Sequence, residues 1–251
     1  MTDLPSPGSP ALEHLTDHAG DRVGAAALSH EHARRWAFLG TVVAGYAAVT
    51  TVLIAFGLLL TKVLLSGPVG TFDDNVTSWS ADNRVGALDS VTNVVSRSAD
   101  TLGAIGIACI AAIAFGIARK WRAIAVLVVG LALELAMFLA ANFIVDRPRP
   151  SVAKLGSEPS TSSFPSGHTA AATVLFVGIA LIAVWCGARM WLRIAAWAVA
   201  VVLVVNVAFA RVYRGLHHPS DVLVGAVFGL ACLAVSALAV RAAAGPLRRD
   251  P

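Results

Sequence analysis

Charged residues are scarce in this sequence. Of its 251 residues, 19 are Lys or Arg and 15 are Asp or Glu, so charge makes up 14% of the chain against 57% for hydrophobic residues. Six long apolar stretches contain a single charged residue, Glu134. A disordered chain is richer in charge, and an ordinary soluble domain carries charge along every helix. The composition therefore excludes both classes and indicates a membrane protein.

Cysteine is rare as well. Cys109, Cys186 and Cys232 are odd in number and all lie in the apolar stretches, so neither a disulfide framework nor a metal site is predicted, and no cofactor is implied. The alternation of apolar and polar residues that marks transmembrane strands is missing. Residues 1–33 also lack the apolar core of a signal peptide.

The apolar stretches have the length that a helix needs to cross the hydrocarbon layer. They cover residues 36–61, 101–118, 123–145, 169–187, 194–210 and 222–240. We predict an all-α polytopic membrane protein with six transmembrane helices in one bundle over residues 36–241. A disordered cytoplasmic tail is expected over residues 1–35 and a short cytoplasmic tail over residues 242–251. The longest connection, residues 62–100, is predicted to form short amphipathic helices with a structural role.

Basic residues at the helix ends predict the orientation. With both termini in the cytoplasm, the inner side holds clusters such as Arg34 with Arg35 and Arg119 with Lys120. This bias also explains the net charge of +4, so nucleic-acid binding is not predicted. We expect a multi-pass protein of the cell or inner membrane with its polar site on the outer face. The sequence does not indicate an oligomeric state.

Three short polar strings follow or precede apolar stretches on that outer face. They are Asp-Arg-Pro-Arg-Pro at residues 146–150, Phe-Pro-Ser-Gly-His-Thr at residues 164–169, and Ala-Arg-Val-Tyr-Arg-Gly-Leu-His-His-Pro-Ser-Asp at residues 210–221. Ser166, Gly167 and His168 open a helix, where free N–H groups and the helix dipole favour an anion such as phosphate. Arg149 and Arg211 are each suited to grip two oxygens of a phosphoryl group.

His217 and Asp221 are four residues apart at a helix start. The carboxylate is expected to accept the Nδ1–H of His217 and to leave Nε2 as a nucleophile, while His168 donates a proton to the leaving oxygen. Taken singly, each string has a plainer interpretation as a topological arginine, a helix cap or a surface ion pair. Their occurrence together favours the chemical interpretation.

The strings resemble the signature of the type-2 phosphatidic acid phosphatase family, which reads Lys-x6-Arg-Pro, Pro-Ser-Gly-His and Ser-Arg-x5-His-x3-Asp. Arg149-Pro150 matches the end of the first part, residues 165–168 match the second, and Arg211, His217 and Asp221 match the third. The resemblance implies a phosphohistidine mechanism without a metal, with His217 as nucleophile, Asp221 as its partner and His168 as general acid. It also implies that Arg149, Arg211, Ser166 and Gly167 hold the phosphate.

Two positions depart from this signature. Asn142 stands at the lysine position and Ala210 at the serine position. We expect Asn142 to lie beside the phosphate and Arg147, or else Lys154, to replace the missing positive charge. Arg147 is the favoured substitute because Pro148 holds it on the same short segment as Arg149.

The predicted function is hydrolysis of a lipid phosphate or diphosphate. A phosphotransferase with the same intermediate, a non-catalytic lipid-phosphate binder and, more weakly, a vanadate-holding haloperoxidase remain alternatives. Phosphatidate, phosphatidylglycerol phosphate and polyprenyl diphosphate all place a phosphate at the interface, and no motif here distinguishes among them.

Overall fold

The computed structural model describes residues 10–156 and 161–244, and all regular structure in these ranges is helical. The order is α1 (Pro10–Lys62), the turn η1 (Leu64–Ser66), α2 (Pro68–Asp82), α3 (Gly86–Ser98), α4 (Thr101–Ile117), α5 (Trp121–Ile144), α6 (Gly167–Ala172), the π-helical turn η2 (Thr173–Val177), α7 (Gly178–Trp185), α8 (Met190–Tyr213) and α9 (Pro219–Ala244). The all-α prediction is confirmed.

Five helical segments are long and apolar enough to cross a membrane. They are Glu31–Ser66, Trp121–Ile144, Gly167–Trp185, Met190–Tyr213 and Pro219–Ala244. A sixth span is obtained when α3 and α4 are taken as one broken span with a bend of 58°, because α4 alone has only 17 residues. The chain is thus a multi-pass membrane protein.

The first helix begins earlier than predicted. α1 starts at Pro10 rather than at Trp36, since residues 11–35 contain no proline and are rich in Ala, Leu, Glu and Arg, which favour helix. The rest of the predicted N-terminal tail, residues 1–9, lies outside the described residues. So does most of the predicted C-terminal tail, residues 245–251.

The core of the bundle lies among α1, α5, α9 and the α6–η2 segment. Glu134 on α5 is 6% exposed and therefore belongs to this interior. α9 approaches α6 closely, because a Cβ on Gly225 would lie 2.5 Å from the carbonyl oxygen of Ser166. Gly229, one turn further along, lies equally close to Ala170. These glycines let α9 support the start of α6 through direct backbone contact.

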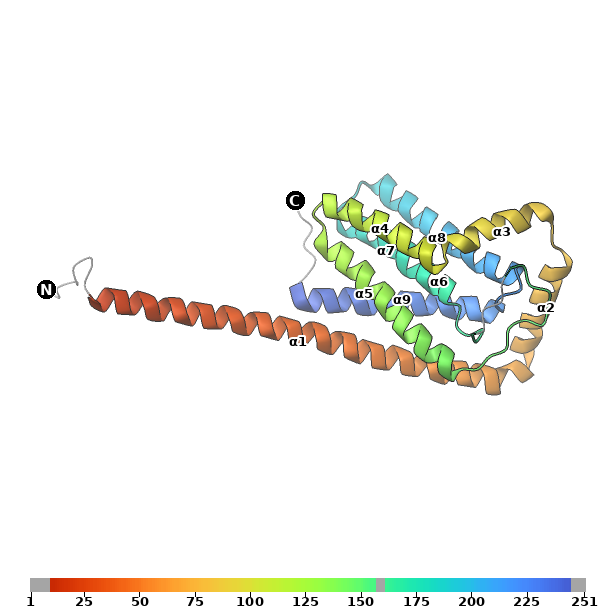
Figure 1. Cartoon of the computed structure of the whole chain (residues 1–251), viewed down its shortest axis with the longest axis horizontal. Helices are drawn as coiled ribbons and strands as arrows, with labels where there is room; N and C mark the ends of the chain where they lie inside the picture. Colours follow the sequence, from red (N-terminus) through yellow and green to blue (C-terminus); the bar gives the residue numbers. More distant parts are fainter. Residues whose placement is uncertain (1–9, 157–160, 245–251) are drawn as a thin grey trace.

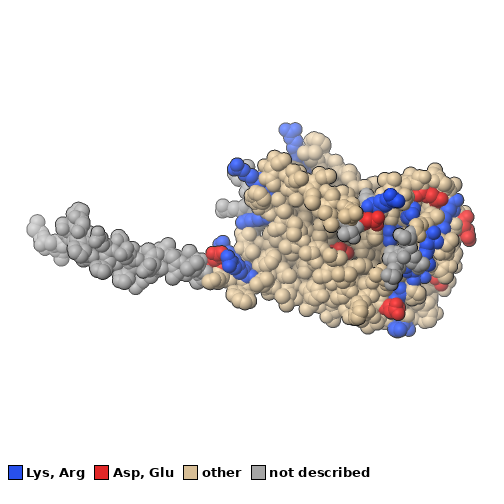
Figure 2. Space-filling model, viewed as in Figure 1, with Lys and Arg blue, Asp and Glu red and all other residues tan. Residues whose placement is uncertain are grey.

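The predicted short helices between residues 62 and 100 are α2 and α3. They lie across the end of the bundle at which α5 ends and α6 begins (Figure 1). Tyr213 at the end of α8 ties α3 down, since its hydroxyl lies 2.9 Å from Asp89 Oδ1 and also accepts the N–H of Val85 at 2.9 Å. Charged side chains gather at the two ends of the helix bundle, and few lie on the surface between them (Figure 2).

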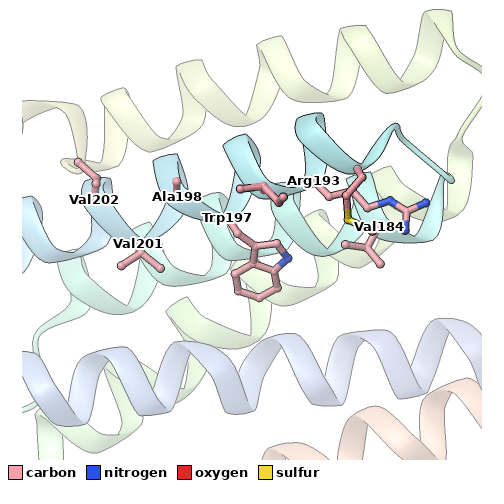
Figure 3. A pocket seen from close by; sticks show the side chains of 8 residues that line it. Val184, Arg193, Trp197, Ala198, Val201 and Val202 are labelled. Carbon is pink, nitrogen blue, oxygen red and sulfur yellow. The ribbon is translucent and has the colours of Figure 1, made fainter.

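An apolar groove of about 700 Å³ lies along α7 and α8 (Figure 3). Val184 of α7 and Trp197 and Val201 of α8 line it, and Arg193 is its one charged member. Such a surface suits contact with lipid tails.

Candidate active site

The three polar strings meet at one end of the bundle. The N–H of Ser163 donates to the carbonyl of Arg147 at 2.9 Å, which joins the two ends of the connection between α5 and α6. The N–H of Ser166 donates to the carbonyl of Asp221 at 3.1 Å, which joins the same connection to the start of α9. Main-chain bonds therefore fix the three strings relative to one another.

His217 lies in the loop between α8 and α9 and is 3% exposed. Its Nδ1 lies 2.7 Å from the carbonyl oxygen of Ser163, and because a carbonyl only accepts, Nδ1 carries the proton and Nε2 keeps its lone pair. Burial lowers the pKa of His217 to about 4; the positive charges of Arg211 and Arg149 act in the same direction, and Asp221 opposes them. The imidazole is therefore neutral at pH 7.

The expected hydrogen bond from His217 to Asp221 is corrected. Nδ1 lies 3.8 Å from Asp221 Oδ2, beyond hydrogen-bond distance. The fully buried carboxylate accepts instead from the guanidinium of Arg147, from Ser163 Oγ at 2.5 Å and from the N–H of His218 at 2.9 Å. Asp221 thus acts on His217 by its charge and through Ser163, whose hydroxyl binds Asp221 and whose carbonyl binds the ring.

The expected role of Arg147 is corrected too. Its side chain is 1% exposed and donates to Asp221, to Asp73 Oδ2 at 2.7 Å and to Ser220 Oγ at 2.8 Å. Asp73, on α2, also accepts the N–H of Ser220 at 3.0 Å and so caps the start of α9. Arg147 is held between two carboxylates, which leaves its positive charge neutralised rather than offered to a phosphate.

Asn142 lies at the end of α5 and faces the neighbouring loop. Its amide nitrogen donates to the carbonyls of Ser162 at 3.0 Å and Phe164 at 3.3 Å. The side chain thus braces the segment that leads into α6, and this geometry replaces the expectation that it lies beside the phosphate.

Ser166 is the N-cap of α6 and is fully buried. Its Oγ accepts the N–H of Thr169 at 3.4 Å and lies 2.9 Å from Thr169 Oγ1. A Cβ at Gly167 would lie 3.1 Å from the ring of Phe138, so the absence of a side chain lets the loop approach α5. The local feature suited to an anion is the N-terminal end of α6 itself, since the Ser166 hydroxyl serves the cap.

His168 follows in the first turn of α6. Its Nε2 lies 2.6 Å from Oδ1 of Asp100, the residue that precedes α4. The His168 side chain is 26% exposed and that of Asp100 50%. Of the two site histidines, His168 is the more accessible to a ligand.

A polar cavity of about 190 Å³ opens beside His168, and Asp100, Arg97, Arg211 and Arg214 are among its lining residues. Arg211 is 4% exposed; its Nη1 donates to Ser96 Oγ at 2.8 Å, and its Nε has no hydrogen-bond partner in the described part of the chain. Buried guanidinium N–H groups without a partner are suited to an anionic ligand.

Arg149 lies near both His168 and His217. Its Nη1 donates to the carbonyl of Leu216 at 2.6 Å, and its other nitrogens donate to Thr161 and to the carbonyl of Ser162. Arg149 and Arg211 act electrostatically on both His217 and His168. The structure therefore brings together Arg149, Arg211, His168 and His217, whereas Arg147 and Asn142 serve the surrounding frame.

Sequence reasoning missed three side chains of this site. Asp73, Ser96 and Asp100 come from the connection between α1 and α4 and contact Arg147, Arg211 and His168, respectively. They belong to no motif. The one sequence feature that could have pointed to Asp100 is its position just before an apolar run, where helix N-caps are found.

Comparison with known proteins agrees with this architecture. The family model described as the PAP2 superfamily matches residues 123–244, from α5 to the end of α9. A solved structure described as the first transmembrane PAP2 type phosphatidylglycerolphosphate phosphatase from Bacillus subtilis is similar with a TM-score of 0.65 at 24% identity, covering 74% of this chain and 93% of that chain.

The structure of Aquifex aeolicus LpxE is similar with a TM-score of 0.54 at 23% identity, covering 64% of this chain and 92% of that chain. No curated protein matches. At these identities the two structures show a shared fold. The segment matched by the family model contains all three polar strings, and the fold extends beyond it on the N-terminal side. The chain therefore resembles the PAP2 superfamily over residues 123–244 and shares the fold of both solved structures.

Proposed function

We propose that the protein is a membrane phosphatase that hydrolyses a lipid phosphate or diphosphate through a phosphohistidine intermediate. The observation that carries this proposal is the state of His217. The Ser163 carbonyl holds its Nδ1–H at 2.7 Å, burial keeps the ring neutral, and Nε2 is left with its lone pair near two arginines. A neutral imidazole oriented in this way is a nucleophile for phosphorus.

The phosphate group enters the polar cavity and is held by Arg149, Arg211 and the start of α6. Nε2 of His217 forms a bond to phosphorus, the bond to the lipid oxygen breaks, and His168 donates its proton to that oxygen. Water then attacks the phosphohistidine and gives a proton to His168, which releases phosphate and restores both rings. Arginines supply the positive charge along this path, so no metal ion is required.

The remaining parts of the proposal concern the membrane. The site lies at the outer face of the cell or inner membrane, and the lipid tail stays in the bilayer beside the helices. Both termini then lie in the cytoplasm. The Bacillus subtilis neighbour carries the name of a phosphatidylglycerolphosphate phosphatase, which makes phosphatidylglycerol phosphate the first substrate to test.

The test is phosphate release by the purified protein in detergent micelles, with phosphatidate, phosphatidylglycerol phosphate and a polyprenyl diphosphate. Wild type is expected to release phosphate from at least one lipid, and His217→Ala is expected to lose turnover together with any acid-labile phosphoenzyme. No release from any lipid would leave a non-catalytic lipid-phosphate binder as the better assignment.

The matched control is His218→Ala, which removes the adjacent imidazole but keeps the main-chain N–H that Asp221 accepts. It is expected to retain most of the activity. Equal losses at His217 and His218 would contradict the assignment of the nucleophile. Product that forms only when an alcohol acceptor is added would indicate a phosphotransferase with the same intermediate.

A further inference from the structure

The connection between α1 and α4 places a carboxylate on the candidate acid. Asp100 Oδ1 lies 2.6 Å from Nε2 of His168, and both residues line the polar cavity. Asp100 lies outside the segment that the family model matches, and no motif in the sequence points to it. In the described part of the chain, Nδ1 of His168 has no hydrogen-bond partner.

We propose that Asp100 is the positioning residue for His168. It accepts the Nε2–H and so fixes the ring, with Nδ1 as the nitrogen that serves the leaving oxygen. This inference rests on the proposed function, because it assigns a role within the same reaction. It also explains why a carboxylate lies in a cavity built to take an anion.

The charges around His168 require such a partner. Arg211 and Arg149 act on its ring, and Arg97 and Arg214 line the same cavity. The two guanidinium groups that act on the ring are unfavourable to an imidazolium, and Asp100 is the anion that contacts it directly. If Asp100 is replaced by a neutral residue, the protonated ring has only positive charges near it and no anion in contact.

As the bond between phosphorus and the lipid oxygen breaks, that oxygen takes the proton from Nδ1, and the N–H electron pair stays on the ring. His168 becomes neutral, while its Nε2 keeps its proton and still donates a hydrogen bond to Asp100. Water later returns a proton to Nδ1 when it attacks the phosphohistidine. Asp100 stays ionised throughout and touches no reacting atom.

The test compares leaving groups. For an alkyl monophosphate, whose leaving oxygen needs a proton, Asp100→Asn should lower kcat/KM by roughly 10 to 100-fold, part of the effect of a general acid. For a 4-nitrophenyl phosphate with the same alkyl tail, whose leaving oxygen is stable without a proton, the change should stay within about threefold. Asp100→Glu, which keeps the charge, should recover part of the loss.

The matched control is Asp82→Asn. Asp82 ends α2, is exposed and undergoes the same change of charge in the same outer connection. It should leave both substrates unaffected. Equal losses on both substrates in Asp100→Asn would assign Asp100 a merely structural role. A gain in activity with tighter inhibition by inorganic phosphate would show that its carboxylate only competes with the ligand, and either result overturns the proposal.

A double-mutant cycle gives a second, independent readout. If Asp100 acts through His168, Asp100→Asn should have almost no further effect on alkyl monophosphate turnover in a His168→Ala protein. An unchanged, multiplicative loss would refute the coupling. Failure of the proposed function appears differently, as absence of phosphate release by wild type from every lipid.

Discussion

The sequence assigns Arg147 to the phosphate, whereas the structure assigns it to the frame around the site. Replacing Arg147 therefore tests which of these two roles is correct. Arg147→Ala removes the guanidinium that bridges Asp73 and Asp221, whose side chains are 1% and 0% exposed. Both carboxylates then stay buried without their cation. Breaking a buried ion pair by removing one partner costs about 3 to 5 kcal/mol.

A loss of this size lowers the unfolding midpoint of a protein of this length by about 6 to 20 °C. The assay is thermal unfolding in detergent micelles, followed by the loss of helical circular dichroism. Arg97→Ala is the control, since Arg97 is exposed at the end of α3 and its loss should change stability by no more than about 0.5 kcal/mol. Activity of Arg147→Ala should fall in parallel with the folded fraction.

The double variant Arg147→Ala with Asp73→Asn is a second test. It removes one of the two buried carboxylates that the loss of Arg147 leaves without a cation. Its midpoint should lie above that of Arg147→Ala alone. The reasoning would be refuted if Arg147→Ala unfolded within about 2 °C of wild type while phosphate release was lost. That result would return Arg147 to the phosphate, as the sequence alone suggests.

Burial lowers the pKa of His217 to about 4, so on the acidic side kcat/KM should begin to fall only as the pH drops through about 4, where Nε2 becomes protonated. An acidic limb near the ordinary value of 6.5 would contradict this. Asn142→Leu removes two donated hydrogen bonds and should lower the free energy of unfolding by about 1 to 3 kcal/mol. The side chain would instead lie at the phosphate if Asn142→Leu were as stable as wild type and Asn142→Lys raised kcat/KM about tenfold. Gly225→Ala forces a Cβ against the backbone of α6 and should destabilise by about 1 to 3 kcal/mol, whereas Gly40→Ala, which has open space, should not; equal midpoints would argue against the close contact. Activity should survive EDTA, since arginines supply the positive charge, and a strict Mg²⁺ requirement would overturn the mechanism.

The membrane architecture could be predicted from the sequence because its cause is local. A run of about 20 apolar residues is a helix that crosses the hydrocarbon layer, whatever the rest of the chain does. The polar strings could be located for the same reason, since they lie at the ends of such runs. Counting the spans then places all three strings on one face, which is where the structure has them. The pair α3 and α4 shows the limit, because the apolar pattern does not predict the bend of 58° between the two helices.

The partners of the site residues depend on tertiary structure alone. Asp73 lies 74 residues from Arg147, Asp100 lies 68 from His168, and Ser96 lies 115 from Arg211. No periodicity relates positions so far apart. His217 and Asp221, four residues apart, instead suggest a direct hydrogen bond, which the folded chain does not make because Nδ1 and Oδ2 lie 3.8 Å apart. The reason is competition: a buried carboxylate accepts from the donors that packing brings nearest, and here Arg147, Ser163 and His218 lie nearer than the ring. Sequence determines which groups are available in each loop, and packing decides which of them meet.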